Sequence, residues 1–372
     1  MNKIFLILVL SLLSRETFAW GSRYVVDAPI RWHSDTNTVG FKIQPVSFPV
    51  GSSFRTGLLD AIAILNRNPS LIRTRLNPDS DWVSVSNGVN EIWFTDNSLV
   101  LMGAPAICIS HFNPFALGVW NMTEADVIFS TSETYTASRN AWDTWPYMGA
   151  ARPLQTTALH ELGHAMGLMH ENRLYNIMGE DWTHVNLFGT TLIPTLGEDA
   201  TTGLVRIYGA NSTVRPDVAV SNYKYLGVSG EYSTHQRTTL RAAITGETAI
   251  AFTDPLDPIE PNQLSFYVKA AQLITVEFTF ENNGPTSLPR TMSHIVLSDN
   301  RTISSRDRFL QAQAIPMSKD RPTTRTFLIR LPADLVPGQR YYVGAIIDAE
   351  NTLIEATKRN NTSYIPLFIT NP

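Results

Sequence analysis

Cysteine is nearly absent from this sequence: Cys108 is the only one in 372 residues. No disulfide can therefore form within the chain, and its stability must come from hydrophobic cores. Charge is also sparse, with 17% charged residues and a net charge of −4. This balance argues against a nucleic acid as a partner. With 43% hydrophobic residues, the composition is that of an ordinary globular protein, and the length favours two domains.

Long apolar runs are also missing. The longest one, residues 4–13, is too short to span a bilayer. It follows Lys3 and precedes a polar segment that ends at Ala19, which is the pattern of a signal peptide at residues 1–19. We therefore expect a bacterial chain that is secreted, periplasmic or bound to a cell surface. After cleavage, no membrane span should remain.

The most informative stretch begins at His160 and reads HELGHAMGLMH. On a helix, His160 and His164 share one face because they lie four residues apart, so both imidazoles can bind one ion. Gly167 lets the backbone leave the helix, and the chain can then turn so that His170 supplies a third ligand. Three protein ligands leave a fourth position for water, which is typical of one catalytic Zn²⁺ ion.

Glu161 directly follows the first of these ligands. Its carboxylate can reach a water on the ion without ligating the ion, which is the position that a general base needs. Each histidine alone would be better explained as an ordinary core or surface residue. The complete pattern is too rare by chance for that explanation.

The stretch resembles the metzincin metallopeptidase motif, HExxHxxGxxH followed by a methionine turn. Residues 175–179, Tyr-Asn-Ile-Met-Gly, match that turn, and Met178 lies eight positions after His170, the short spacing of the matrixin branch. Other branches carry a tyrosine two places after the methionine, where this chain has Glu180. The resemblance implies that Met178 forms an apolar floor beneath the imidazoles; an ordinary core methionine is the alternative.

The surrounding pattern predicts an α+β metzincin catalytic domain at residues 20–209, with a mixed twisted sheet and long helices. Apolar residues at helical spacing predict helices at 54–65, 154–169 and 198–208, the first capped by Ser52 or Ser53. Alternating and β-branched runs predict strands at 24–35, 89–95, 105–111 and 125–130.

Residues 107–114 resemble the matrixin edge strand that borders the substrate cleft. The resemblance implies that a peptide substrate adds as a strand along Ala106, Cys108 and Ser110. A plain edge strand is an equally weighted alternative. The segment at 174–193 would then form the wall of the pocket for the residue after the scissile bond, with an apolar lining.

The chain also departs from matrixins. They hold a second, structural zinc ion; His111 matches one of its ligands, but Val127 or Ile128 stands where another histidine is expected. We therefore predict one zinc ion and a hydrogen-bonded His111. Few residues separate Trp20 from the first strand, so no prodomain fits, and Cys108 is expected to be a buried thiol instead of a latency switch.

Residues 210–216 have the composition of a linker. From 217 to 372, short strands and frequent turns predict an all-β immunoglobulin-like sandwich. The segments at 297–304, 341–348 and 355–361 resemble the CARDB domain of bacterial surface and exported proteins, which implies that this domain binds a surface or substrate.

Three acids of this second region, Asp299, Asp307 and Asp348, could together bind a cation. Acids at turns and strand ends are more often simply solvated. A structural Ca²⁺ ion is therefore possible but not predicted.

Taken together, the sequence predicts a zinc-dependent endopeptidase that acts on protein substrates, with Glu161 as general base. One alternative is a surface adhesin whose metzincin domain has lost activity, but the intact Glu161 and three ligands argue against it. A second alternative is a zinc hydrolase that acts on a non-peptide amide.

Overall fold

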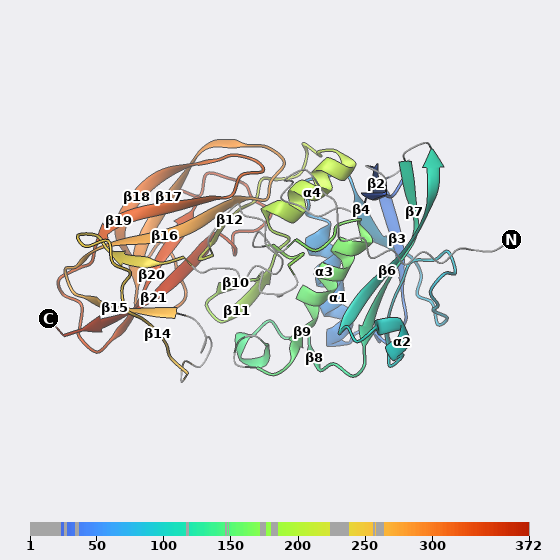
Figure 1. Cartoon of the computed structure of the whole chain (residues 1–372), viewed down its shortest axis with the longest axis horizontal. Helices are drawn as coiled ribbons and strands as arrows, with labels where there is room; N and C mark the ends of the chain where they lie inside the picture. The colour runs from blue at the N-terminus through green and yellow to red at the C-terminus, as the bar shows by residue number, and fades with distance from the viewer. Residues whose placement is uncertain are drawn as a thin grey trace.

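The computed structural model describes residues 24–25, 28–33, 37–116, 119–145, 147, 149–171, 176–179, 185–223, 238–255, 257 and 264–371. The expected signal peptide lies outside these residues. Figure 1 shows a sheet with helices at the N-terminal end of the molecule and a body made of strands at the C-terminal end. We call them the first and the second domain.

The first domain is built on a mixed seven-stranded sheet. Its order is β1-β2-β7-β5-β3-β4, and β6 also pairs with β7. The β6–β7 pair is antiparallel, whereas the β2–β7, β7–β5, β5–β3 and β3–β4 pairs are parallel. The strands are β1 (Tyr24–Val25), β2 (Ala28–Arg31), β3 (Thr38–Ile43), β4 (Arg73–Leu76), β5 (Glu91–Thr95), β6 (Ala106–Ala116) and β7 (Val119–Ser130). Among the described strands β6 pairs only with β7, so β6 is an edge of the sheet.

Helices cover the sheet: α1 (Ser53–Leu65), α2 (Ser98–Leu101), α3 (Leu154–Ala165) and α4 (Glu198–Tyr208). The predicted cap of α1 is confirmed, since the Ser52 side chain accepts a hydrogen bond from the Arg55 N–H at 3.1 Å. The bounds predicted for α4 are confirmed as well. No helix within the described ranges is long and apolar enough to cross a membrane.

The core of the first domain lies between the sheet and these helices. Phe41, Ile92 and Val127 of the sheet are fully buried against Leu58 of α1 and Leu162 of α3. The smaller elements β8 (Tyr135–Thr136), β9 (Arg152–Pro153) and the β10–β11 hairpin (Val185–Phe188, Thr191–Pro194) follow the main sheet in sequence. Burial of apolar side chains on both partners is what fixes α3 against the sheet.

The second domain consists of two sheets packed face to face. One contains β12 (Val218–Ser221), β13 (Leu240–Ala242), β16 (Leu273–Asn282) and β19 (Thr323–Arg330). The other has the order β14-β15-β21-β20-β17-β18, over Ala251–Thr253, Leu264–Lys269, Thr362–Thr370, Arg340–Ile347, Leu288–Ser298 and Arg308–Met317. The pairs are antiparallel except β15 with β21, which are parallel. Phe278, Phe327 and Leu367 are buried between the sheets, as expected for a sandwich.

The segment at 210–216 is attached to both domains. The Asn211 N–H donates to the Pro69 carbonyl at 2.7 Å, and the Ala356 N–H donates to the Pro216 carbonyl at 3.1 Å. These bonds restrict the freedom that a linker composition suggests.

Candidate metal centre

The metal-binding stretch begins where α3 ends. The Leu168 N–H donates to the Gly163 carbonyl at 3.1 Å, and the Gly167 N–H donates to the His164 carbonyl at 2.9 Å. These two bonds form a Schellman cap, which terminates a helix around a left-handed residue. The prediction that this helix continues to Met169 is therefore wrong: the helix ends at Ala165.

Gly167 satisfies two separate requirements at this turn. Its φ is +90°, in a region that side-chain-bearing residues rarely adopt. A Cβ there would also lie 2.8 Å from the Ile30 carbonyl oxygen. The sequence indicated the change of direction but not the close approach of β2.

Two side chains hold the last carbonyls of this turn. The Trp32 Nε1–H donates to the Ala165 carbonyl at 2.8 Å, and the Tyr208 hydroxyl donates to the Met166 carbonyl at 2.9 Å. Both groups are far away in sequence, one after β2 and one at the end of α4. No pattern in the sequence indicated either contact.

Three imidazoles converge beyond this turn. The Nε2 atoms of His160, His164 and His170 lie 3.1 Å from one another in all three pairs. The Nδ1 of His160 lies 2.7 Å from the Ile177 carbonyl oxygen, and the Nδ1 of His164 lies 2.8 Å from the Leu168 carbonyl oxygen. Since a carbonyl can only accept, both Nδ1 atoms carry the proton, and their Nε2 lone pairs face the common centre.

This donor set fits a zinc ion. The Nε2 lone pairs of His160 and His164 face a common centre, where a cation can bind them together with His170. Around a tetrahedral zinc with bonds of about 2.0–2.1 Å, ligand atoms are spaced by about 3.3 Å, close to the distance found. Burial, and then the charge of His170, lowers the pKa of His160 to about 4. The imidazole is therefore neutral at neutral pH, which is the form that binds metal.

Glu161 lies beside these imidazoles on α3. Its side chain is buried, and burial raises the pKa of the carboxyl to about 8 although the Cys108 backbone N–H donates to it. A carboxyl whose pKa is near neutrality can both take up and release a proton at neutral pH.

The hydrogen bond from Cys108 also indicates how the edge strand β6 is oriented. It shows that the main-chain groups of Cys108 face away from β7, along the free edge of the sheet. Ala106 and Ser110 are two residues away on either side, so their main-chain groups face the same edge. The Cys108 thiol itself is buried, 3.6 Å from the Ser110 hydroxyl.

Met178 is buried in a turn that packs on α3. Its N–H donates to the Asn176 side chain at 2.7 Å, and the Ile177 N–H donates to the Leu196 carbonyl at 3.0 Å. Its sulfur packs so closely on α3 that a Cβ at Gly163 would overlap it. Gly163 was not predicted as a site residue, although a glycine inside a helix is a signal of close packing.

The proposed cleft wall falls partly outside the described residues, Trp182 included. Leu187 and Phe188 lie on β10, and Leu192 lies on β11. His111 lies 3.1 Å from the Ser86 hydroxyl through its Nε2. It is hydrogen-bonded beside the edge strand, as expected.

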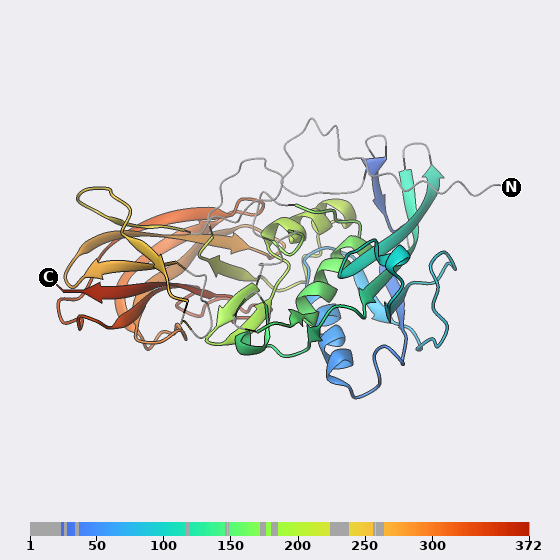
Figure 2. The same ribbon diagram turned by 60° about the horizontal axis from the view of Figure 1, so that its bottom comes forward.

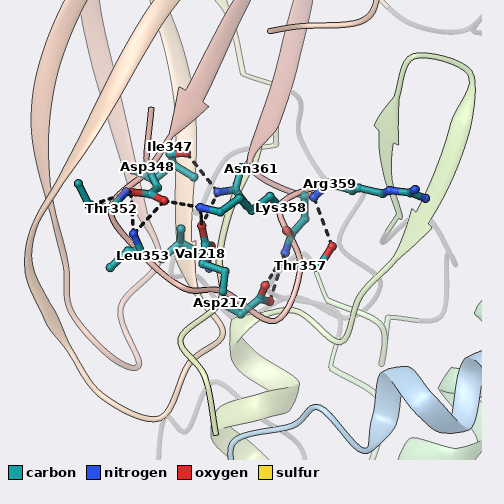
Figure 3. Close-up of polar contacts among 12 residues, drawn as sticks. Asp217, Val218, Ile347, Asp348, Thr352, Leu353, Thr357, Lys358, Arg359 and Asn361 are labelled. Carbon is teal, nitrogen blue, oxygen red and sulfur yellow. Dashed lines mark hydrogen bonds and ion pairs between the residues drawn. The ribbon is translucent and has the colours of Figure 1, made fainter. Parts of the chain in front are cut away.

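The three acids considered for a cation lie in separate hydrogen-bond sets. Asp307 accepts from the Ser304 N–H, and Asp299 accepts from Asn300. Asp348 accepts from Thr352 and from the Lys358 ammonium group (Figure 3). Within the part of the chain that the structure describes, the three histidines are the one group of possible ligands close enough to hold an ion.

Several solved structures resemble this chain. One is the CARDB domain of a Pyrococcus furiosus protein in complex with di-metal ions, which is 15% identical, covers 42% of this chain and 90% of its own, and has a TM-score of 0.25. The solution structure of that domain is 18% identical, covers 28% and 85%, and has a TM-score of 0.23. Likenesses this weak carry no argument about function. No curated protein matches the sequence.

A family model gives the informative match. Residues 107–209 match the model described as Matrixin, of the M10 peptidases. This range contains β6, the three converging histidines, Glu161 and Met178. The chain therefore contains a matrixin-like metallopeptidase domain.

Proposed function

We propose that this protein is a secreted zinc-dependent endopeptidase that hydrolyses peptide bonds of protein substrates. The observation that carries the proposal is the set of three Nε2 atoms 3.1 Å apart. The buried carboxyl group of Glu161 lies on α3 together with His160 and His164. Secretion rests on the signal peptide expected at residues 1–19. A role for the second domain in binding a surface or substrate rests on its resemblance to CARDB.

The chain supplies the ligands and the proton transfers. His160, His164 and His170 would hold the ion, which when bound supplies Lewis-acid polarisation of a carbonyl and of water. Glu161 takes a proton from the attacking water and later gives it to the leaving amine nitrogen. Burial raises the pKa of the Glu161 carboxyl, which favours uptake of the proton from water, and a cation bound beside it would favour the release of that proton.

The edge strand and the methionine turn position these groups. Main-chain groups of Ala106 and Ser110 face the free edge of β6, where an extended peptide can add as a further strand. The Cys108 N–H fixes the Glu161 carboxylate next to that edge. Met178 supports α3 from behind, so that the imidazoles keep their orientation.

The test compares two substitutions in the full chain. Glu161→Gln should keep stoichiometric zinc but lower casein hydrolysis by about 10²–10⁴-fold, the usual contribution of a general acid–base group. His164→Ala should lose the metal as well. Zinc is measured by elemental analysis, and Asp299→Asn, at an exposed carboxylate of the second domain, is the matched control.

Casein cleavage at the wild-type rate by Glu161→Gln would overturn the assignment of the base. Wild-type protein that holds zinc but cleaves no protein substrate would instead favour the inactive adhesin. Chelator-sensitive hydrolysis restricted to small amides would favour the non-peptide hydrolase.

A further inference from the structure

The first residue of α4 lies at the contact between the two domains. Glu198 is 1% exposed. Its two carboxylate oxygens accept hydrogen bonds from the Asn282 N–H at 2.8 Å and from the Arg321 N–H at 2.9 Å, both in the second domain. In Figures 1 and 2, α4 lies on the side of the first domain that faces the sandwich.

Other groups of the same helix add to this contact. The Thr202 hydroxyl donates to the Asp320 carboxylate at 2.7 Å, and Arg206 forms an ion pair with Asp320 at 3.4 Å. Burial raises the pKa of Glu198, although its two N–H donors and the charge of Lys319 favour the ionised form. If the second domain moved away, the buried Glu198 carboxylate would lose both of these main-chain N–H donors. A buried carboxylate without hydrogen-bond donors is costly, so these bonds favour one arrangement of the two domains.

The same segment continues to the metal ligands. Two residues before Glu198, the Leu196 carbonyl accepts the Ile177 N–H at 3.0 Å. The Ile177 carbonyl in turn lies 2.7 Å from the His160 Nδ1. A series of hydrogen bonds, joined by the main chain of residues 196–198, therefore connects the second domain to the methionine turn and to the imidazole of His160.

We propose that Glu198 is a positioning residue of the metal centre, through which the second domain holds Leu196, the methionine turn and His160 in place. The inference rests on the proposed zinc site and adds to it a role for the second domain other than binding a surface. Groups that orient a ligating histidine set metal affinity, and their loss typically weakens it by about 10–100-fold. Because Glu198 acts through two intermediates, we expect an effect at the lower end of that range.

The experiment uses the full chain with zinc bound. Glu198→Gln keeps the shape of the side chain but turns an amide NH₂ group toward one of the two N–H donors. Zinc release into the chelator 4-(2-pyridylazo)resorcinol should become about tenfold faster. The visible absorption of the cobalt-substituted protein should also shift, because the orientation of the His160 ring changes.

Thr202→Val is the matched control. It removes a hydrogen bond at the same interface and on the same helix. That bond runs from the Thr202 hydroxyl to Asp320 and not toward Leu196. Its zinc release and cobalt spectrum should equal those of the wild type. Glu198→Ala is a second variant, in which water can reach the two N–H groups, and it should change zinc release in the same direction.

Wild-type zinc release and cobalt spectrum in both Glu198 variants would overturn the proposal. Equal acceleration by Thr202→Val would also overturn it, since general loosening of the interface would then explain the result. Failure of both Glu198 variants to fold would assign Glu198 to overall stability instead. Zinc release requires no hydrolysis, so these results stay separate from a failure of the peptidase assay.

Discussion

Two buried acidic sites, one in each domain, differ in their partners. In the first domain, Glu161 is buried with one main-chain N–H donor to its carboxylate, and burial keeps its pKa near neutrality. In the second, the buried carboxylates of Asp348 and Glu355 share the Lys358 ammonium group, at 2.6 and 2.9 Å (Figure 3). The Asp348 carboxylate also accepts from Thr352 and Leu353.

This difference suggests different roles for the two sites, proton transfer in one and stabilisation of a loop in the other. The protonation of a buried acid that has no lysine or arginine partner responds to the charges that arrive beside it, which suits proton transfer. The Lys358 and Thr352 bonds lower the pKa of Asp348 against the effect of burial, whereas at Glu355 burial outweighs the same lysine and raises the pKa. The comparison supports the proposed role of Glu161 in proton transfer and a role of the Asp348 set in holding the loop at 348–361.

The largest expected effect is that of Gly167→Ala in the first domain. A positive φ and overlap with the Ile30 carbonyl should together lower the free energy of unfolding by about 2–4 kcal/mol. The turn toward His170 would shift, so zinc should also bind more weakly. All eight tryptophans precede residue 183, and tryptophan fluorescence in urea therefore reports this domain. Unchanged zinc affinity would contradict the role of the turn.

Lys358→Met should have the next largest effect, confined to the second domain. It leaves two buried carboxylates without their cation, which should lower the free energy of unfolding by about 2–3 kcal/mol. The effect is reduced because the Lys358 side chain is 41% exposed and water can take its place. Circular dichroism should show the loss while tryptophan fluorescence does not. Lys269→Met, at an exposed lysine of β15, is the control.

Asp126→Asn tests an unpaired acid that lies away from the metal centre. Burial, and then the Glu124 charge, raises the pKa of Asp126 to about 9. The folded chain thus binds a proton that the unfolded chain releases near pH 4. The resulting stabilisation is complete below pH 4 and is lost as the pH rises to about 9.

The measurement is the difference in unfolding free energy between wild type and Asp126→Asn at pH 6 and pH 8. The stability of the wild type relative to the variant should fall by up to about 1.4 kcal/mol per pH unit. Zinc contributes equally to both proteins, so the difference isolates Asp126. A difference that does not depend on pH would show that Asp126 is ionised in the folded chain.

Trp32→Phe should have the smallest effect. It removes the donor to the Ala165 carbonyl but keeps most of the ring, so stability should fall by about 1 kcal/mol. Trp82→Phe, at a side chain that is 87% exposed, is the control in urea denaturation. Equal changes in the two variants would mean that the bond to Ala165 contributes nothing.

Much of the candidate site was predictable because its residues are close in sequence. Helical geometry relates His160 to His164, and the bounds of α4 follow from a clean apolar stripe between Gly197 and Gly209. The predicted end of α3, at Met169, lies beyond the observed end at Ala165. Apolar residues continue through the Schellman turn and imitate helical spacing. The cap geometry of Gly167 decided the boundary instead.

The interface could not be predicted in this way. An acid at the start of a helix is favoured by the helix dipole, so Glu198 has a sufficient local explanation. Its actual partners are main-chain groups of Asn282 and Arg321, which no side-chain pattern reveals. For the same reason β6 and β7 extend further than expected: residues 112–116 gain their strand conformation from pairing with the neighbouring strand.

The position of β21 has a consequence for how the chain matures. This strand, residues 362–370, lies between β15 and β20, so the six-stranded sheet can close only after these residues have emerged during synthesis and export. A second domain that supports the metal centre through Glu198 would then complete that centre late. The metal centre would then reach its final geometry only after the last strand of the chain has paired.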